Sequence, residues 1–239
     1  MNDTILHYPL PDWVSLLFLI SIPLPFILIL ALIRTLTHSH NMQAVFTGCV
    51  LFFVLYLAYI AVASYWGWFE VVSMPPRVLL LTTFPYAFFL FGVVLRSQTY
   101  RGLYDSVTLE SLIRLHIFRL IGVFFILLAL YEGLPKPFAY IAGSGDILTA
   151  VSALFVANVV ERRRPHYKRI ALFWNIFGAV DILFTAAGAN ALTFLSIKNG
   201  TMGVDTLATF PFCIIPAFAP PTILFLHWAI YQKLRHPLG

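Results

Sequence analysis

Charged residues are scarce in this chain of 239 residues, which contains 15 Lys and Arg and 10 Asp and Glu, or 10% of the total. Soluble globular domains carry about 25% charged and roughly 45–50% apolar residues. Here 60% of the residues are hydrophobic, and the mean hydropathy is +0.88. The composition therefore excludes an ordinary soluble domain. It predicts an integral membrane protein of a cell or inner membrane, with the lipid bilayer as its main partner.

Motifs for several kinds of chemistry are also missing. Cysteine occurs only twice, at Cys49 and Cys213, so the chain has no disulfide framework and no CxxC or zinc-ligand spacing. The HExxH motif of zinc proteases is absent. A retinal Schiff base is not expected, because no lysine falls in the middle of an apolar stretch; the lysines are Lys136, Lys168, Lys198 and Lys233.

What the chain does have is long apolar stretches. About 20 apolar residues form a helix that crosses the hydrocarbon core of a bilayer. The sequence therefore predicts an all-α, polytopic protein, with residues 1–239 forming one domain of seven transmembrane helices. The expected spans are about 13–36, 42–66, 77–95, 109–131, 138–160, 169–192 and 208–231.

The positions of the basic residues predict the orientation of these helices. Lys and Arg collect in cytoplasmic loops of membrane proteins. If the N-terminus lies outside, the outer segments hold only Arg77, Lys136 and Lys198. The inner segments then hold Arg34, Arg96, Arg101, Arg162, Arg163, Arg164, Lys168, Arg169, Lys233 and Arg235. We therefore expect the N-terminus outside and the C-terminus in the cytoplasm. The net charge of +5 indicates this topology, with no nucleic-acid partner.

Among the ionisable residues of the expected spans, five are candidate functional residues, because a charge at membrane depth is costly and usually has a function or a partner. They are His116 and Arg119 in the fourth span, Asp146 in the fifth, Asp181 in the sixth and His227 in the seventh. A rise of 1.5 Å per residue places Arg119, Asp146 and Asp181 within about 4 Å of the midplane, and His227 roughly 10 Å below it. We therefore expect the arginine and the two aspartates to share one layer.

Small residues on the same helix faces indicate that both aspartates point into the bundle. Small side chains mark close helix contacts in membranes. On the fifth span Asp146 shares a stripe with Gly143, Ala150, Ala153 and Ala157, and on the sixth Asp181 shares one with Gly178, Thr185 and Gly188.

Prolines interrupt the seventh span at Pro211, Pro216, Pro220 and Pro221. Each proline removes a backbone donor from the helix. Pro220 and Pro221 free the carbonyl groups of Pro216 and Ala217, and free backbone groups at membrane depth must be buried in protein or line a cavity. The pattern predicts an irregular helix, which either borders a binding site or is a static kink.

These residues support three functional hypotheses, and they leave open whether the protein is an enzyme. The first is a membrane protein whose buried site binds, and as a further step translocates, a small ion, proton or metabolite. In it Arg119 attracts an anionic group, Asp146 and Asp181 balance charge or carry protons, and His116 and His227 relay protons.

The second hypothesis is a membrane-embedded redox enzyme that holds haem b, or another metal, between His116 and His227. The third is a receptor or accessory membrane subunit in which Arg119, Asp146 and Asp181 form a purely structural salt-bridge network. In that case the remaining N–H groups of Arg119 would bond to Asn175 or to backbone carbonyls.

Overall fold

Seven helical segments of the chain are long and apolar enough to span a membrane. The computed structural model describes residues 9–36 and 40–235, and within these ranges it contains helices and no strand. The seven segments are Asp12–Leu36, Gln43–Tyr65, Leu79–Arg96, Leu109–Leu130, Lys136–Glu161, Tyr167–Asn199 and Ile214–Arg235. Six of them start within two residues of the position expected from the sequence, so the all-helical class and the number of segments are confirmed.

The sixth and seventh segments differ from the expected boundaries. Helix α9 (Tyr167–Asn199) continues seven residues past the predicted end at residue 192, and it ends at Gly200, which has a φ of 66°. A glycine in this left-handed conformation is a common helix terminator. The last helix, α10 (Ile214–Arg235), begins six residues later than predicted, because residues 205–208 form a separate 3₁₀ helix, η5, and residues 210–213 form a turn that contains Pro211.

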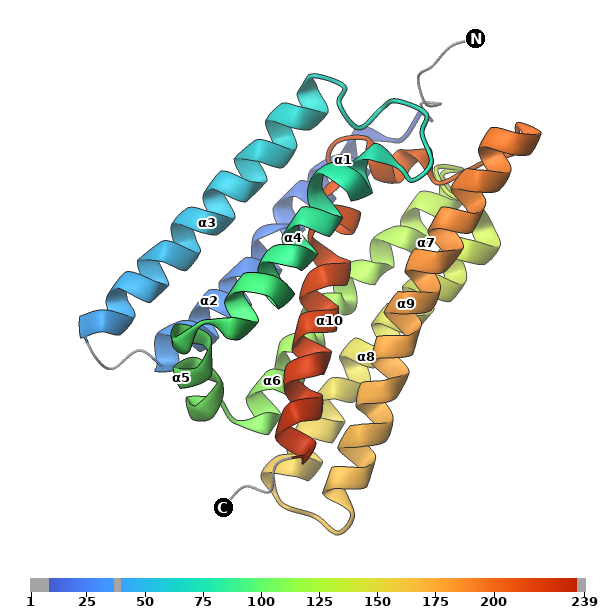
Figure 1. Ribbon diagram of the computed structural model, residues 1–239. Helices are drawn as coiled ribbons and strands as arrows, with labels where there is room; N and C mark the ends of the chain where they lie inside the picture. Colours follow the sequence, from blue (N-terminus) through green and yellow to red (C-terminus); the bar gives the residue numbers. More distant parts are fainter. Residues whose placement is uncertain (1–8, 37–39, 236–239) are drawn as a thin grey trace.

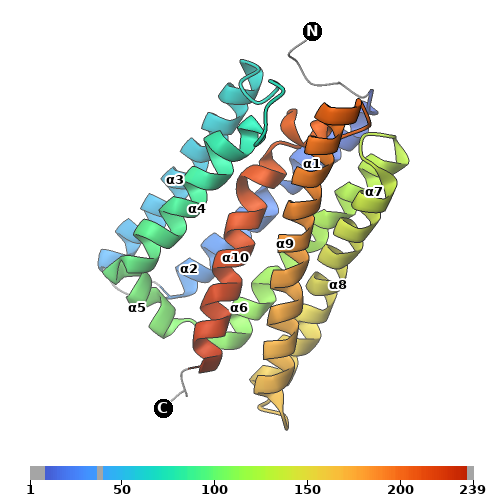
Figure 2. The same cartoon turned by 45° about the vertical axis from the view of Figure 1, so that its right-hand side comes forward.

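The helices differ in how much of the bundle surrounds them (Figures 1 and 2). The fourth segment consists of α6 (Leu109–Leu115), η4 (His116–Gly122) and α7 (Val123–Leu130), and all three pack against α8 (Lys136–Glu161). Helix α9 packs against α8 and α10. In both views α3 (His40–Tyr65) lies at the edge of the bundle, beyond α1 (Asp12–Ser21) and α2 (Pro23–Leu36).

The third and fourth segments are not continuous α-helices. The third contains two π-helical stretches, η1 (Leu79–Thr83) and η2 (Phe89–Val93), separated by α4 (Phe84–Phe88) and followed by the 3₁₀ turn η3 (Val94–Arg96). The fourth is 3₁₀-helical over seven residues in η4. Such segments are uncommon inside long helices and frequently accompany functional sites.

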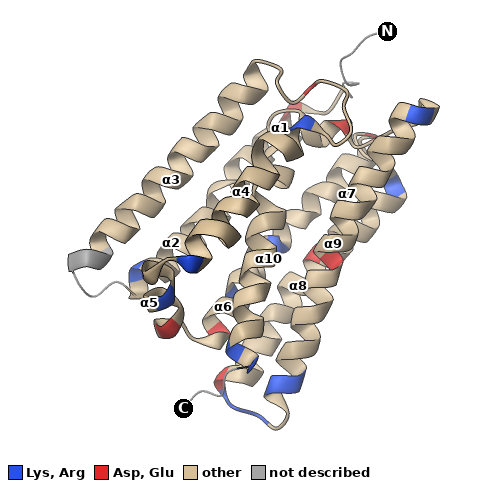
Figure 3. Ribbon diagram, viewed as in Figure 1, with Lys and Arg blue, Asp and Glu red and all other residues tan. Residues whose placement is uncertain are grey.

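Most of the basic residues lie at the end of the bundle where α10 terminates (Figure 3). The α8–α9 connection contributes Arg162, Arg163 and Arg164, and α10 contributes Lys233 and Arg235. Lys198, in contrast, lies in the last turn of α9, at the opposite end of that helix from the α8–α9 connection, and Arg77 lies just before η1. In the described residues, basic side chains are therefore distributed unevenly between the two ends of the bundle.

A short helix, α5 (Gln98–Ser106), lies between the third and fourth segments. Its N-terminus is capped by Ser97, whose hydroxyl accepts a hydrogen bond from the backbone N–H of Tyr100 at 3.1 Å. The Thr108 hydroxyl caps α6 by accepting a hydrogen bond from the backbone N–H of Ser111, and the Ser106 hydroxyl donates to the carbonyl of Gly102. The ammonium group of Lys233 lies 4.5 Å from the centre of the Tyr104 ring, which ties α5 to the end of α10.

Candidate functional site

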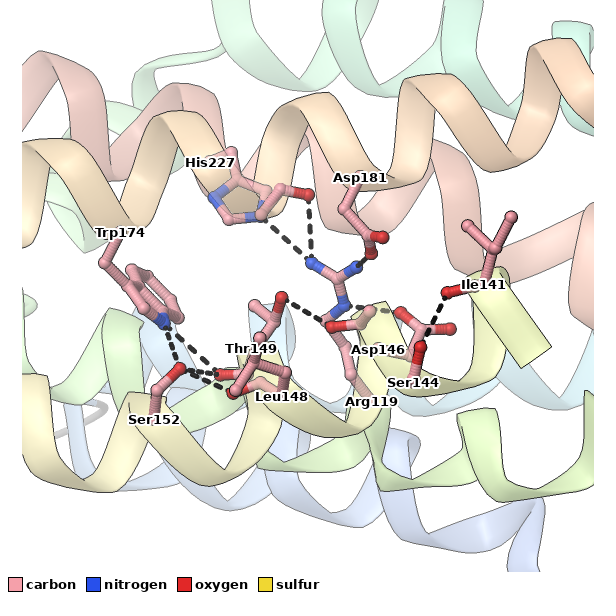
Figure 4. A network of polar contacts seen from close by, with 12 residues as sticks. Arg119, Ile141, Ser144, Asp146, Leu148, Thr149, Ser152, Trp174, Asp181 and His227 are labelled. Atoms are coloured by element: carbon pink, nitrogen blue, oxygen red, sulfur yellow. Dashed lines mark hydrogen bonds and ion pairs between the residues drawn. The ribbon is translucent and has the colours of Figure 1, made fainter. Parts of the chain in front are cut away.

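Arg119 lies between the two aspartates at the centre of the bundle (Figure 4). Its Nε donates to Asp146 Oδ1 at 2.6 Å, and its Nη2 donates to Asp181 Oδ2 at 2.5 Å. The Arg119 side chain is fully buried, while the side chains of Asp146 and Asp181 retain 9% and 12% of their exposure. Three helical segments far apart in the sequence thus supply one compact ion cluster, as the estimated depths predicted.

The remaining guanidinium nitrogen, Nη1, faces α9 and α10. It donates to the carbonyl oxygen of Gly178 at 3.0 Å and lies 3.4 Å from His227 Nε2. Four of the five N–H groups of Arg119 are therefore committed to these partners. Asn175, which the sequence offered as a partner for Arg119, bonds to His227 instead.

The contacts of Asn175 identify the tautomer of His227. The side-chain Nδ2 of Asn175 donates to the backbone carbonyl of His227 at 3.2 Å, so its Oδ1 is the atom that faces the imidazole. Nδ1 of His227 lies 2.8 Å from this oxygen and must donate to it. Nε2 is then the unprotonated nitrogen that accepts from Arg119, and His227 is a neutral member of the cluster.

The formal charges of the cluster do not cancel. One guanidinium faces two carboxylates, and His227 is neutral, so the group carries one residual negative charge when both aspartates are ionised. A buried charge without a counterion costs several kcal/mol. The arrangement therefore favours uptake of one proton or one cationic group.

His116 lies directly against His227. The centres of the two imidazole rings are 4.3 Å apart, and the ring of Trp174 approaches His116 edge-on at 5.1 Å. His116 is fully buried, and neither of its ring nitrogens has a hydrogen-bond partner among the described residues. Leaving a buried polar group unpaired costs about 1–3 kcal/mol. We therefore expect the His116 imidazole either to have a function or to bind a water molecule.

Two glycines create the space for the polar side chains. A Cβ atom at Gly178 would lie 2.7 Å from Cε1 of His227, and a Cβ atom at Gly145 would overlap the carboxylate of Asp181. At both positions the Cβ atom would lie closer to its neighbour than Cβ atoms do in real proteins, so only glycine fits without a shift of the neighbouring side chain. Gly178 belongs to the stripe of small residues expected on the sixth span and marks a close contact there, as expected, whereas Gly145 lies outside the stripe expected on the fifth span. Both glycines leave room for a polar side chain of a neighbouring helix.

Other helices satisfy the carbonyl groups that the prolines of α10 free, but the predicted irregular helix is not found, since Ile214–Arg235 is one α-helix. The hydroxyl of Tyr56 donates to the carbonyl of Ala217 at 2.9 Å, and the hydroxyl of Thr83 donates to the carbonyl of Pro216 at 2.7 Å. These are the two carbonyl groups that Pro220 and Pro221 cannot satisfy within the helix. Helix α10 nevertheless continues through both prolines, because side chains from α3 and η1 replace the lost backbone donors.

A cavity of about 410 Å³ extends from the ion cluster toward the loops at the far end of the bundle. Arg119 and Asp146 line its inner end, and Thr83 and Pro216 line the wall beside them. Its outer end is formed by polar and loop residues, which include Ser73, Ser196, Thr201 and Asp205. Helix α10 and the π-helical η1 therefore both border a cavity.

The depth estimated for His227 from the sequence was wrong. Because α10 begins at Ile214 and not at residue 208, its middle lies about 4 Å from His227 along the helix. This shift brings His227 level with Arg119 and explains the contact between them. His116, Arg119, Asp146, Asp181 and His227 consequently form one connected group.

This geometry does not fit haem or a metal ion at the two histidines. A haem coordinated on both faces must lie between its two axial imidazoles, and rings with centres 4.3 Å apart leave no room for a porphyrin. The described residues contain no group of three or more His, Cys, Asp or Glu side chains arranged to hold a metal ion. The guanidinium of Arg119 beside His227 Nε2 would also repel a metal cation.

Several parts of the site could not be anticipated from the sequence. Thr83 and Tyr56 carry no motif, and their roles depend on which helix they face; Asn175 was expected beside Arg119 and not beside His227. The 3₁₀ geometry of η4 was also missed. It places His116 and Arg119 one above the other, because residues three apart are eclipsed in a 3₁₀ helix.

Comparison with known proteins identifies a family without assigning an activity. Residues 75–235 match the family model described as a domain of unknown function, DUF8737. The match covers well over half of the chain and includes all five candidate site residues, so the chain belongs to this family. No curated protein and no solved structure shows a significant match.

Proposed function

We propose that this member of the DUF8737 family is an integral membrane protein that binds a proton or a small cationic ligand at the Arg119 cluster. In our proposal all seven apolar segments cross a cell or inner membrane, with the N-terminus outside and the C-terminus in the cytoplasm. The collection of basic residues at the end of the bundle where α10 terminates supports this orientation.

The single observation that carries the binding proposal is the charge of the cluster. Two carboxylates share one guanidinium at 2.5 and 2.6 Å, in a place where Arg119 has no exposure. Because Arg119 already donates to both carboxylates, it is poorly suited to the capture of an anion suggested by the sequence. The residual negative charge supports a proton or a cation as the bound species.

Translocation of a proton is a further part of the proposal, and the histidines support it. His227 accepts from Arg119 and contacts His116, which extends the chain of polar groups to a second imidazole with unpartnered nitrogens among the described residues. The cavity borders Asp146 from the opposite direction. In this scheme protons reach the cluster through the cavity and leave through His227 and His116.

Infrared spectroscopy of the purified protein tests proton binding directly. We expect wild type to show the band of a protonated carboxyl group near neutral pH, and Asp146→Asn and Asp181→Asn to lack it, because each retains only one carboxylate for Arg119. Asp105→Asn on α5 removes an equal charge outside the cluster and should keep the band. If the wild-type spectrum contains no such band between pH 5 and 8, proton binding is ruled out.

Proteoliposomes test transport and topology. A pH-sensitive dye trapped inside should report proton entry driven by a membrane potential for wild type and Asp105→Asn, but not for Asp146→Asn.

Single cysteines placed at Arg163 and Lys198, in a variant without Cys49 and Cys213, should react with membrane-impermeant reagents from opposite sides. Labelling of both from the same side would overturn the proposed orientation.

A structural role for the same cluster, as in a receptor or accessory subunit, is the second candidate. The close packing of Arg119 against four partners favours it. It predicts normal proton flux or partner binding in Asp181→Asn whenever the variant folds. Loss of flux in a folded Asp181→Asn protein would therefore decide against a purely structural role.

A further inference from the structure

The cavity beside the ion cluster suggests the kind of ligand that the protein binds. We infer that this cavity binds an elongated amphipathic amine, with its ammonium group at Asp146 and its apolar body directed toward the outer loops. The inference rests on the proposed cation site and adds the chemical class of the ligand.

The charge of the cavity selects a cation. At the ion cluster it is lined by Arg119 and Asp146, and Asp181 also binds Arg119, so these three residues carry one net negative charge. Arg119 is further neutralised by Asp181, which binds it at 2.5 Å. A carboxylate or phosphate ligand would therefore meet net repulsion, whereas an ammonium group would gain a charge-assisted hydrogen bond to Asp146.

The walls of the cavity select an apolar body. Between its two polar ends the lining is formed by side chains such as Val78, Phe125, Phe138, Leu207, Ile215 and Ile223. A small hydrated cation would lose its water shell along these walls without compensation. An alkyl or aromatic body would instead gain hydrophobic contact, and the volume of about 410 Å³ lies within the usual range for small-molecule pockets.

The shape of the cavity selects an elongated ligand. The residues of α9 that line it extend from Ile182 to Ile197, which corresponds to about 22 Å along the helix. Near the outer end Asn190, Thr193 and Ser196 replace the apolar lining residues. A ligand with its amine at Asp146 therefore extends its apolar body along α9, toward these polar side chains.

Thermal unfolding of the full-length protein in uncharged detergent micelles tests this inference. The probes are dodecylamine, dodecanoate and dodecanol, which share one chain length and differ in the charge of the head group. We expect dodecylamine at roughly 100 times its Kd to raise the melting temperature by about 5–10 °C, with little effect of dodecanoate. Asp146→Asn should lose the preference for the amine over the alcohol, and Asp105→Asn should retain it.

A second variant tests the position of the apolar body. Ala186 lines the cavity on α9, and Ala186→Phe fills part of this space without a change of charge. This variant should lose stabilisation by dodecylamine and keep stabilisation by butylamine, which needs only the inner end of the cavity. Equal or larger stabilisation by dodecanoate, or an unchanged amine preference in Asp146→Asn, would overturn the inference.

The two proposals can fail separately. If dodecylamine does not bind while the infrared band still depends on Asp146 and Asp181, the cluster binds only protons and the ligand class is wrong. If the amine binds but no protonated carboxyl group is found, the cation site stands and the proton site does not.

Discussion

Helix α3 and the fourth helical segment have similar apolar compositions but opposite places in the bundle. Within their most hydrophobic windows, 11% of the residues are buried in α3, against 61% in the segment Leu109–Leu130. On α3 large apolar side chains remain exposed, including Val54 and Leu55, at 58% and 67%. The fourth segment is surrounded by helices and carries His116 and Arg119. Hydrophobicity alone therefore does not distinguish a peripheral helix from a central one.

The difference indicates how each helix is stabilised. Exposed apolar residues of α3 are suited to contact with lipid, which is as apolar as the side chains themselves, so little free energy depends on any one of them. In the central segment the side chains contact polar partners and closely packed helices. A single substitution there therefore leaves an unpaired charge or creates steric overlap. Substitutions matched between the two regions should separate these cases.

Arg119→Ala should have the largest effect. Removal of the guanidinium leaves Asp146 and Asp181 buried side by side without a counterion, which we expect to lower the free energy of unfolding by about 3–5 kcal/mol. Unfolding in mixed micelles with increasing denaturing detergent measures this change. Arg101→Ala on the surface of α5 is the matched control, with an expected change within about 0.5 kcal/mol.

If Arg119→Ala fails to fold, a triple variant keeps the prediction testable. Arg119→Met combined with Asp146→Asn and Asp181→Asn removes all three charges together, so the protein should recover most of its stability. A triple variant as unstable as Arg119→Ala would show that the charges are not the cause.

Gly178→Ala should have the next largest effect. The new Cβ atom would meet the His227 ring at 2.7 Å and Thr149 Cγ2 at 2.9 Å, so we expect a loss of about 1–3 kcal/mol in mixed-micelle unfolding. The same substitution at Gly48 on α3 meets nothing within 4 Å. There alanine should stabilise the helix by about 0.5–1 kcal/mol. Equal changes in the free energy of unfolding for Gly178→Ala and Gly48→Ala would contradict the proposed difference in packing between the centre of the bundle and α3.

Tyr56→Phe tests the polar link between α3 and α10. Loss of the hydroxyl leaves the carbonyl of Ala217 without its donor, with an expected cost of about 1–2 kcal/mol in thermal or mixed-micelle unfolding. The control is Tyr59→Phe, which removes a hydroxyl bonded to the Leu81 carbonyl at an exposed position. A larger effect of Tyr59→Phe would show that the carbonyl groups freed by proline are satisfied in another way.

Leu55→Ala on α3 should have the smallest effect. Because the Leu55 side chain is 67% exposed, we expect its truncation to change the free energy of unfolding by less than about 0.5 kcal/mol. Leu128→Ala, at a fully buried position of α7, should cost about 2–5 kcal/mol. A large loss for Leu55→Ala would place the exposed side of α3 in a contact with another protein.

The sequence predicted the depth of the ion cluster more accurately than it predicted the depth of His227. Depth along each helix follows from the fixed rise per residue, and it correctly grouped Arg119, Asp146 and Asp181 in one layer. The same calculation misplaced His227, since it depends on where a helix starts, and the prolines near residue 211 obscured the start of α10. Orientation in the membrane and ligand binding remain predictions.

The amino-acid sequence by itself determined the number of apolar helices and the carbonyl groups freed by Pro220 and Pro221, because both depend only on local composition and backbone chemistry. Tertiary structure decided that Tyr56 and Thr83 donate to those carbonyls, that His227 accepts from Arg119, and that a cavity borders Asp146. These contacts depend on the rotation and shift of each helix against its neighbours. Local hydrophobicity does not specify the rotation or shift of a helix, so the geometry of the site is known only from the packed structure.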